Sequence, residues 1–456
     1  MDLKNKNILI LGLGISGIST VKALNKLGAK ITISDLKDEK ELEENISEIK
    51  NLNIELYLGT NDVPLNNIDL IIKSPGIPLN LDIIKEAEQK GIEVITDLEL
   101  AYRISPNSNF IAITGTNGKT TTTTLVGEFF KKAGFHTHVA GNIGVGILWD
   151  VVSSSKDDIF VVETSSFQLE NTVKFNPKIS LILNITPDHL NWHKTLDNYI
   201  NAKKKIFVNQ TEDEYTILNY DDPLLKNLGE EIKSHLIWFS VDNEISKGAY
   251  IKNGYIVIDD GNEVHNIIRT EEIKILGKHN LENVLASVAI GWIMGLDIKI
   301  MNEVLKTFPG VEHRIEYVDT INGVKFYNDS KGTNPEASIK AIEALKSSII
   351  LIAGGQDKGS EFDNFILSFK YKVKSVVLLG ETKEKIKNTA IKYGFNNIYI
   401  VNTMEEAVNK SYELASTGDN ILLSPACASW DMYSSFEMRG NDFKNYVYDL
   451  REEKNG

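Results

Sequence analysis

The chain alternates short apolar runs with longer stretches in which apolar residues recur at every third or fourth position. Short apolar runs predict buried strands, and the periodic stretches predict amphipathic helices. The strands expected on this basis are 7–11, 30–34, 69–73, 92–95, 110–113, 159–162, 180–185, 215–218, 236–239, 255–258, 324–328, 349–353, 376–379, 397–401 and 420–423. Strands that alternate with helices are typical of α/β proteins, so the pattern predicts that fold class, with mostly parallel sheets.

The alternation falls into three successive units. Thr96-Asp97 opens a helix directly after one predicted strand, and Gly295-Leu296-Asp297 interrupts the pattern a second time. We therefore expect domains at 1–97, 98–297 and 298–456, a division that suits a chain of 456 residues. In the second domain, the apolar runs after residue 214 predict a partly antiparallel extension that carries no candidate chemistry.

The stretch FIAITGTNGKTTTTT, residues 110–124, carries the strongest candidate chemistry. A short strand runs into the turn Gly115-Thr116-Asn117-Gly118, and Lys119 and Thr120 begin a helix. The N–H groups of such a turn point at an anion, the lysine adds positive charge, and the threonine hydroxyl can hold Mg²⁺. Only two residues separate the glycines, so this is a shortened phosphate-binding loop. An ordinary glycine turn is the alternative, but the lysine and threonine favour an ATP site.

Two other predicted strands of this domain also end in polar residues. Glu163 follows the strand 159–162, and Asp188 and His189 follow the strand 180–185. We expect these side chains at the same sheet edge as the glycine loop, where a carboxylate can hold Mg²⁺. A helix-capping role for Glu163 and a structural role for His189 are the alternatives.

The first domain contains a glycine turn of its own. The segment Gly12-Leu13-Gly14-Ile15-Ser16-Gly17 follows the first strand, and Asp35 follows the second, as in dinucleotide-binding domains. This motif is weak by itself and would also fit a nicotinamide-dependent dehydrogenase. Ser74-Pro75-Gly76 forms a further turn at a strand end, where open α/β sheets place their ligands.

Polar clusters also follow the strands of the third domain, at 329–334, 354–359 and 424–430. Three such loops at one edge of a parallel sheet predict a binding site. Upstream of this domain, Asn280 and Asn283 lie three residues apart on the first turn of a predicted helix. This arrangement suits pairing with adenine, although Asn280 could instead cap the helix.

Composition narrows the range of partners. The net charge of −14 argues against a nucleic-acid partner, because phosphate backbones are bound by basic surfaces. Cys427 is the only cysteine and cannot form an internal disulfide, which fits a reducing cytoplasm. The apolar run near the N-terminus is short and broken by glycine, so we expect neither a signal peptide nor a membrane span.

Together these motifs resemble the Mur ligase family along the full length of the chain. The shared motifs are Gly115–Thr120, Glu163, His189, Tyr199-x-x-Ala202-Lys203 and His279-Asn280. Four further segments, 12–17, 163–169, 329–334 and 424–432, resemble the family members that use D-glutamate. The resemblance implies a three-domain Mur ligase architecture, in which Rossmann-like first and third domains flank a central P-loop ATPase-like domain.

The resemblance also implies an activity. The expected reaction is ATP-dependent amide-bond formation, which adds D-glutamate to UDP-N-acetylmuramoyl-L-alanine through an acyl phosphate and releases ADP and phosphate. It would belong to cytoplasmic peptidoglycan precursor synthesis and be carried out by a monomer with small-molecule substrates and neither nucleic-acid nor membrane partners. Another Mur-type ligase or a folylpolyglutamate-synthase-like amide ligase is the nearest alternative. A nucleotide-dependent switch would explain the ATP loop but not the third-domain loops.

Each residue that matches a family motif takes an implied role. The catalytic residues would be Lys119, Glu163, His189 and Lys203. ATP would be bound by Gly115, Thr116, Asn117, Gly118, Lys119, Thr120, Thr121, Asn280, Asn283, Arg314 and Asp329. The UDP-substrate would be bound by Ile15, Ser16, Gly17, Asp35, Leu36, Lys37, Ser74 and Asn142, and D-glutamate by Lys331, Thr333, Lys358, Ser429 and Phe436.

The resemblance implies two Mg²⁺ ions, or Mn²⁺ in their place. Their ligands would be Thr120, Glu163, His189 and a carbamylated Lys203. A carbamate would replace an ammonium group that repels Mg²⁺ with an oxygen ligand. One departure concerns the nucleotide substrate, because Leu36 stands where the family is expected to have a hydroxyl side chain.

Overall fold

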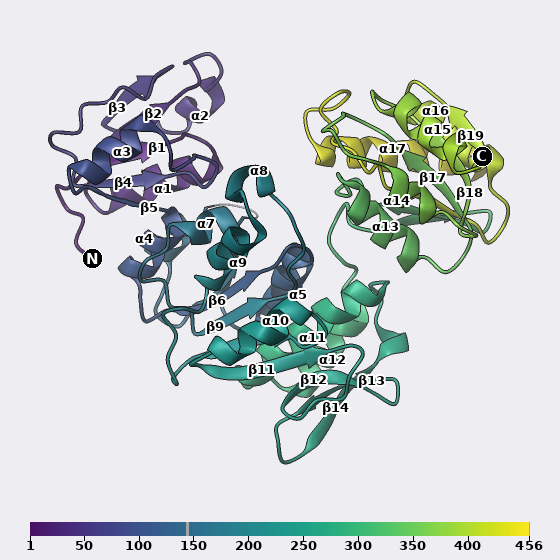
Figure 1. The fold of residues 1–456 in the computed structure, drawn as a ribbon, viewed down its shortest axis with the longest axis horizontal. Helices are drawn as coiled ribbons and strands as arrows, with labels where there is room; N and C mark the ends of the chain where they lie inside the picture. The colour runs from purple at the N-terminus through teal and green to yellow at the C-terminus, as the bar shows by residue number, and fades with distance from the viewer. Residues whose placement is uncertain (143–145, 456) are drawn as a thin grey trace. The chain divides into compact units, whose positions relative to one another are not determined.

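The computed structural model describes residues 1–142 and 146–455, with the helices and strands labelled in Figure 1. The chain forms two compact units, which are described separately. One comprises residues 1–270 and 282–304, and the other comprises residues 271–281 and 305–456.

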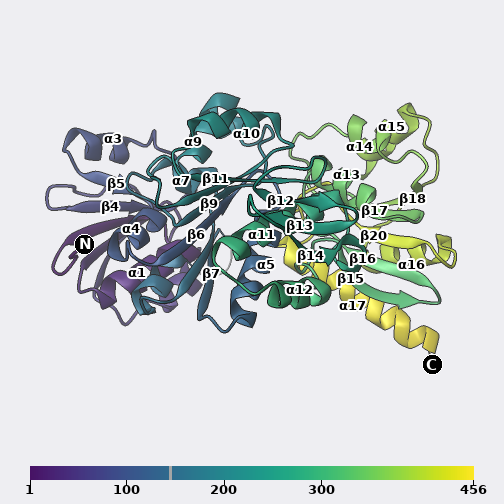
Figure 2. The same cartoon turned by 90° about the horizontal axis from the view of Figure 1, so that it is seen from below.

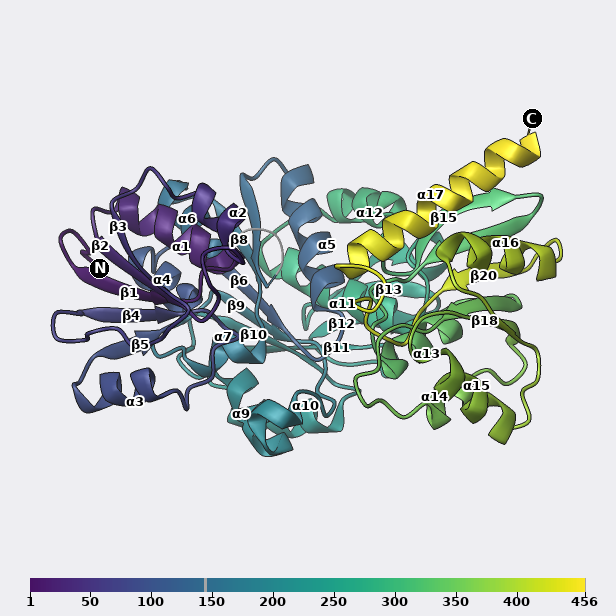
Figure 3. The same cartoon turned by 90° about the horizontal axis from the view of Figure 1, so that it is seen from above.

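The N-terminal sheet of the first unit has five parallel strands in the order β3-β2-β1-β4-β5. Helices α1 and α2 cover one face of this sheet and α3 covers the other (Figure 3). The strand order is that of a Rossmann fold up to its fifth strand, as the glycine turn predicts. The elements are β1 (Asn7–Leu11), α1 (Ile15–Lys26), β2 (Lys30–Asp35), α2 (Glu43–Ser47), β3 (Ile54–Leu58), β4 (Leu70–Lys73), α3 (Asp82–Gln89) and β5 (Glu93–Ile95).

A second sheet in the same unit has nine strands in the order β14-β13-β12-β11-β10-β9-β6-β8-β7. Strands β6 to β12 pair in parallel with their neighbours, whereas β12, β13 and β14 are antiparallel to one another. Helix α5 covers one face, and α9 and α10 cover the other (Figures 2 and 3).

The elements of this second sheet and its helices follow in chain order. They are α4 (Asp97–Ile104), β6 (Asn109–Thr114), α5 (Lys119–Lys132), β7 (Thr137–Gly141), α6 (Ile147–Ser153), β8 (Ile159–Glu163), α7 (Ser166–Glu170), β9 (Ile179–Ile182), α8 (Leu190–His193), α9 (Leu196–Lys204), β10 (Tyr215–Asn219), α10 (Pro223–Leu228), β11 (His235–Ser240), β12 (Gly248–Lys252), β13 (Tyr255–Asp259), β14 (Val264–Arg269), α11 (Lys278–Ile293) and α12 (Ile298–Thr307), with 3₁₀ turns at Gly229–Glu231 and Thr270–Glu272.

The sheet of the second unit has six strands in the order β15-β16-β20-β17-β18-β19, of which only the β15–β16 pair is antiparallel. Side chains of α13, α14 and α15 pack on one face of this sheet, and those of α16 and α17 pack on the other. The elements are β15 (Glu316–Ile321), β16 (Val324–Asn328), α13 (Pro335–Ala344), β17 (Ile349–Ala353), α14 (Asp363–Leu367), β18 (Val373–Leu378), α15 (Lys383–Lys392), β19 (Ile398–Ile400), α16 (Met404–Leu414), β20 (Asn420–Leu423) and α17 (Phe436–Asn455).

Two element boundaries differ from the sequence prediction. The strand expected at 180–185 ends at Ile182, because the next residues turn to contact the glycine loop. The apolar periodicity of residues 197–208 predicts a helix over that range, but α9 ends at Lys204, where N–H groups begin to bond three residues back instead of four. The antiparallel part of the extension is formed by β12, β13 and β14, of which only β13 was predicted.

A buried carboxylate ties α4 to the segment before β9. The side chain of Glu99 is fully buried, and its oxygens accept hydrogen bonds from the N–H groups of Val173, Lys174 and Phe175 at 2.9 to 3.0 Å. Arg103 on the same helix donates to Glu99 from Nε at 2.6 Å. Glu99 therefore satisfies three backbone donors, which are buried or partly buried, and shares the mostly buried Arg103 with Glu93.

We predict that Glu99→Ala lowers the free energy of unfolding by about 2 to 4 kcal/mol, because it leaves three backbone N–H groups without their acceptor and takes one of two carboxylates from Arg103. Chemical denaturation monitored by circular dichroism measures the change. Glu93→Ala is the matched control: Glu93 also binds Arg103 but is 46% exposed, so its loss should cost no more than about 1 kcal/mol. Equal effects of the two substitutions would contradict the prediction.

Candidate active site

The glycine loop between β6 and α5 depends on two glycines. Gly115 has a φ of +152° and Gly118 a φ of +87°, both in the region that side chains avoid. A Cβ atom at Gly118 would lie 2.2 Å from Oδ1 of Asn283, and one at Gly115 would lie 3.0 Å from Leu183. Gly118 directly precedes α5, whose first N–H groups have no partner within the helix. The loop and the helix start therefore form an anion-binding cradle.

Asn184 fixes the shape of this loop, a role that sequence reasoning missed. Its side chain accepts a hydrogen bond from the N–H of Asn117 at 2.9 Å and donates to the carbonyl of Asn117 at 3.1 Å. Its own carbonyl accepts from the N–H of Thr116 at 3.0 Å. The sequence places Asn184 inside an apolar run, and only the early end of β9 makes it available to the loop.

Two lysines converge on one carbonyl oxygen at the base of the loop. Nζ of Lys119 and Nζ of Lys203 each lie 2.9 Å from the oxygen of Gly115. Lys203 belongs to α9 and is 1% exposed. Burial lowers the pKa of Lys203 well below its ordinary value, and the charge of Lys119 lowers it further. Lys203 therefore carries more neutral amine than an exposed lysine does.

Glu163 ends β8 at the same edge of the sheet and is 2% exposed. Its Oε1 accepts a hydrogen bond from Nδ2 of Asn142 at 3.1 Å. Its Oε2 is buried and has no hydrogen-bond partner among the described residues. A buried carboxylate oxygen without a donor is costly, which suits it to a divalent cation.

His189 lies beside these groups in an unusual backbone conformation. It has a φ of +53°, and its Nε2 lies 3.5 Å from Oδ2 of Asp188. Burial lowers the pKa of His189, the charge of Asp188 raises it, and the charges of Lys119 and Lys203 lower it. The neutral imidazole that results is the form that binds metals. The structure thus brings together Lys119, Glu163, His189 and Lys203, the four predicted catalytic residues.

Other residues predicted to bind ATP lie in and around the loop. Thr120 and Thr121 belong to the first turn of α5, and Thr121 is buried. Asn283 packs against Gly118, and its Oδ1 accepts a hydrogen bond from Thr122 at 3.3 Å. This side chain therefore supports the loop from behind.

The first-domain turn is also held by side chains. A Cβ atom at Gly17 would lie 2.3 Å from the carbonyl oxygen of Gly12, and the hydroxyl of Ser74 donates to that oxygen at 3.3 Å. The carboxylate of Asp35 accepts from the N–H groups of Leu13 at 2.8 Å and Lys37 at 2.9 Å. Both oxygens of Asp35 therefore shape the turn, whereas Ile15 and Leu36 are 69% and 66% exposed beside it.

A buried lysine beside this turn was not predicted. Lys73 is 1% exposed and donates to the carbonyl of Ile77 at 2.9 Å, so it holds the turn that contains Ser74. Burial lowers the pKa of Lys73 to about 8, although Glu170 and Asp97 raise it. Burial also raises the pKa of Asp97 to about 6, while hydrogen bonds from Leu98 and Ser16 lower it.

The second unit contains a cavity of about 640 Å³. Its lining includes Asn280, Arg314 and Tyr327. Nε of Arg314 is buried and has no hydrogen-bond partner among the described residues, and Nδ2 of Asn280 donates to the carbonyl of Leu276 at 2.7 Å. A cavity with a buried guanidinium group can accept an anionic ligand.

Two predicted D-glutamate ligands of this unit lie over aromatic rings. Nζ of Lys331 is 5.5 Å from the ring centre of Phe436, and Nζ of Lys358 is 4.3 Å from that of Trp430. Ser429 is buried in the loop that precedes Trp430. The N–H of Thr333 donates to the carbonyl of Lys331 at 2.9 Å.

Arg439 connects the loops that carry these residues, and sequence reasoning missed it. Its guanidinium group is buried and donates to the carbonyls of Ser330, Cys427 and Ala428 at 2.8 to 3.2 Å. Burial lowers the pKa of Arg439 to about 10. No local pattern distinguishes this arginine, because its partners lie 11 to 109 residues away.

Three family models match successive parts of the chain. The "Mur ligase MurD-like, N-terminal domain" matches residues 6–96, the "Mur ligase middle domain" matches residues 113–291, and the "Mur ligase, glutamate ligase domain" matches residues 313–427. A protein of Thermoanaerobacter sp. strain X514 named UDP-N-acetylmuramoylalanine–D-glutamate ligase is 53% identical over 99% of this chain and 100% of its own length. The chain belongs to the Mur ligase family.

Solved Mur ligase structures share the fold. The MurC ligase of Thermotoga maritima, named UDP-N-acetylmuramate-alanine ligase, aligns over 97% of this chain and 99% of its own, with 18% identity and a TM-score of 0.59. The MurF ligase of Thermotoga maritima in complex with ADP aligns over 93% of this chain and 95% of its own, with 15% identity and a TM-score of 0.56. The predicted α/β Mur ligase architecture is confirmed.

Across the described residues of this Mur ligase, every helix is too short or too polar to cross a bilayer.

Asp329 gives the second unit a testable pH dependence. It is 4% exposed, and its carboxylate accepts from the hydroxyl of Ser424 at 2.7 Å. Burial raises the pKa of Asp329 to about 7, although the Ser424 hydrogen bond and Arg314 lower it. When folding raises the pKa of an acid, the protonated acid stabilises the folded state at low pH. This stabilisation is lost as the pH rises through the pKa that the acid has in the folded protein.

We therefore predict that the wild-type protein loses stability relative to Asp329→Asn as the pH rises from about 4 to about 8, by up to about 4 kcal/mol. Asparagine has a similar shape and does not titrate in this range. Thermal unfolding of both proteins across this pH range measures the difference, which cancels the titration of all other groups. A difference that stays constant with pH would contradict the prediction.

Proposed function

We propose that this Mur ligase adds D-glutamate to UDP-N-acetylmuramoyl-L-alanine with consumption of ATP, as a step of peptidoglycan precursor synthesis. The observation that carries the proposal is full-length similarity to a ligase named for that reaction. The glycine loop, Glu163, His189 and Lys203 at one sheet edge supply the groups that phosphoryl transfer from ATP needs.

The reaction needs ATP because the alanyl carboxylate is a poor electrophile. An amine cannot displace an oxygen anion from it, whereas phosphorylation converts that oxygen into the leaving group phosphate. The amine of D-glutamate then attacks the carbonyl carbon of the acyl phosphate and loses a proton, and the tetrahedral intermediate expels phosphate. The products are the amide, ADP and phosphate.

Mur ligases are ATP-dependent, and the glycine loop is proposed to bind the phosphates of the nucleotide. The N–H groups of Gly115–Gly118 and the charge of Lys119 bind the terminal phosphates and stabilise negative charge during transfer. Thr120 and Thr121 extend this cradle into α5. Asn280 and Asn283 are proposed to face the adenine, Arg314 the phosphates and Asp329 the ribose.

The unpaired Oε2 of Glu163 fits a divalent cation. Thr120 and Glu163 would hold one Mg²⁺, and His189 together with a carbamylated Lys203 would hold a second, with Mn²⁺ as a substitute. Bound Mg²⁺ would supply positive charge that offsets the charge on the transferred phosphoryl group. Asn142 hydrogen-bonds to Glu163 and is proposed to position the alanyl carboxylate beside it.

The nucleotide substrate is proposed to bind at the first-domain turn. Ile15, Ser16 and Gly17 would bind the diphosphate through the start of α1. The segment Asp35–Lys37 would face the uracil, with Asp35 acting through the turn that it shapes and Leu36 offering apolar contact in place of a hydroxyl group. Ser74 would support this turn through Gly12.

D-Glutamate is proposed to bind at the loops that Arg439 connects. Lys331 and Lys358 provide positive charge for the two carboxylates of the amino acid, and Thr333 and Ser429 provide hydroxyl groups. Phe436 lies under Lys331 and limits where its ammonium group can point.

We further propose domain boundaries near residues 97 and 297 and a monomeric enzyme that acts in the cytoplasm.

Phosphate release from ATP tests the proposed reaction. With Mg²⁺ and UDP-N-acetylmuramoyl-L-alanine present, we expect release with D-glutamate but not with L-glutamate, a diamino acid or no amine, and a product heavier by one glutamyl residue. Glu163→Gln is the control variant and should be slower by roughly 100-fold or more. Equal release with every amine would refute the D-glutamate site, and no release by protein that binds ATP would point to another acceptor.

Carbamylation of Lys203 has its own test. Its buried, readily neutral amine can attack CO₂, and ¹³C nuclear magnetic resonance in ¹³C-bicarbonate should show one carbamate signal that is absent from Lys203→Ala. Activity of that variant should fall by roughly 100-fold or more. Lys204→Ala is the matched control, because Lys204 is the next residue but forms a surface ion pair with Glu231. A signal that persists in Lys203→Ala, or full activity of that variant, would refute the carbamate.

A further inference from the structure

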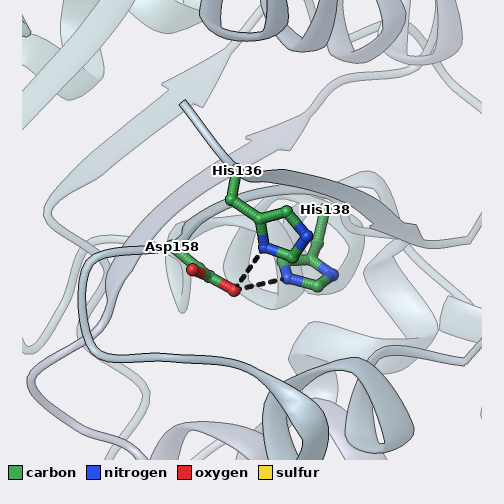
Figure 4. A group of neighbouring side chains, drawn as sticks. All are labelled: His136, His138 and Asp158. Atoms are coloured by element: carbon green, nitrogen blue, oxygen red, sulfur yellow. Dashed lines mark hydrogen bonds and ion pairs between the residues drawn. The ribbon is translucent and has the colours of Figure 1, made fainter. Parts of the chain in front are cut away.

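Two histidines and an aspartate gather at the end of the β7–β8 pair that lies away from Glu163. His136 directly precedes β7, His138 is the second residue of β7, and Asp158 directly precedes β8. Figure 4 shows the two imidazole rings pointing at the same carboxylate. None of these residues takes part in the proposed ligase reaction.

The three side chains meet at one oxygen atom. Oδ2 of Asp158 lies 2.7 Å from Nδ1 of His136 and 2.9 Å from Nε2 of His138 (Figure 4). The two imidazole rings are nearly perpendicular, with their centres 4.8 Å apart. One ligand atom from each of the three residues therefore lies within 4.8 Å of the other two.

The residues that surround this cluster hold two of its members in place. Oδ2 of the partly buried Asp150 on α6 lies 3.9 Å from Nδ1 of His138, the ring nitrogen that faces away from Asp158. The ring of His138 stacks on Phe160, with the ring centres 4.8 Å apart. Ser155 donates to Asp158 from its hydroxyl group and, at 3.3 Å, from its N–H. Metal ligands are oriented by a carboxylate that binds the second nitrogen of a histidine and by donors to a carboxylate. Ser155 already provides such donors, whereas Asp150 would have to approach His138 by about 1 Å to form a hydrogen bond.

The chemistry of these donors selects the kind of ion. Two imidazole nitrogens and one carboxylate oxygen suit Zn²⁺, whereas Mg²⁺ prefers oxygen ligands alone. Zinc lies about 2.0 to 2.2 Å from such ligands, and a tetrahedral arrangement separates them by roughly 3.3 Å. Each nitrogen would need to move away from Oδ2 of Asp158 by about half an ångström. The side chain of His136 is 75% exposed, so it can make this movement and leave a fourth position to water.

We propose that His136, His138 and Asp158 form a binding site for Zn²⁺ or a similar divalent transition metal, with Asp150 as the partner that orients His138. The strand β7 lies at the edge of the nine-stranded sheet and pairs only with β8. A metal here would join the start of β7 to the start of β8. It would lie about 16 Å along the strands from Glu163, so its effect would be on stability and not on chemistry.

The other histidine–carboxylate cluster shows by contrast what favours this site. Glu312, His313 and Glu316 also gather within reach of one ion. Lys444, however, already forms ion pairs with both Glu312 and Glu316. The ammonium group of Lys444 therefore already neutralises the carboxylates of that cluster. Asp158 instead contacts two imidazoles, which carry positive charge only when protonated.

Zinc titration calorimetry tests the proposal on the full chain, first stripped of metals with a chelator and then held in excess MgCl₂. The wild-type protein should bind one more Zn²⁺ than His136→Ala does, and bound Co²⁺ should show the visible absorption of a tetrahedral site. Asp150→Asn should keep this Zn²⁺ but bind it roughly 10- to 100-fold more weakly. Zn²⁺ should raise the melting temperature of the wild-type protein more than that of His136→Ala.

His265→Gln is the matched control, because His265 also faces an aspartate, Asp260, at 3.4 Å but belongs to no group of three candidate metal ligands among the described residues. This variant should bind Zn²⁺ as the wild-type protein does. Unchanged stoichiometry and affinity in His136→Ala, or no Zn²⁺ bound by the wild-type protein at saturating metal, would overturn the proposal. The three side chains would then be a hydrogen-bonded cluster in which Asp158 accepts from both imidazoles.

Discussion

The carbonyl oxygen of Gly115 receives hydrogen bonds from two lysines on different helices, and the candidate active site is organised around this contact. Two ammonium groups that meet at one oxygen in a poorly solvated position repel each other. Burial and the neighbouring charge therefore favour the neutral form of Lys203 and leave Lys119 as the main cation. The same positive field favours the neutral form of His189. An anion bound in the cradle would offset this positive charge. A carbamate oxygen in place of the amine of Lys203 would have the same effect.

The sequence could predict the sheets and the location of the chemistry because both follow from local patterns. Apolar runs such as 110–113 and 159–162 are strands, and parallel strands bring Glu163 and the glycine loop to one edge without any knowledge of tertiary contacts. The boundary errors have a related cause. Leu183 and Asn184 are part of an apolar run, which predicts a continuing strand. Their hydrogen-bonding groups instead bind the end of β6 and the glycine loop, and a hydrophobicity pattern contains no information about such contacts.

Residues that support the site from a distance could not be predicted. Asn184, Lys73 and Arg439 are ordinary members of strands, turns or helices in the sequence, and each acquires its role from partners that only the fold brings near. Asp35 shows the opposite case. Its position at the end of β2 suggested a ligand contact, and the structure adds that its carboxylate accepts hydrogen bonds from the N–H groups of Leu13 and Lys37. The motif therefore did not predict that this carboxylate holds the glycine turn.

The contact between Gly118 and Asn283 has a consequence for how the protein is made. Thr122, on the helix that follows the glycine loop, hydrogen-bonds to a residue 161 positions later in the chain. During synthesis the N-terminal sheet and β6 emerge from the ribosome long before α11 does. The nascent chain therefore carries a loop that Asn184 can already hold but that lacks the contact with Asn283 until that residue has been translated. Nucleotide binding by the growing polypeptide should accordingly begin late, after most of the first unit has already folded.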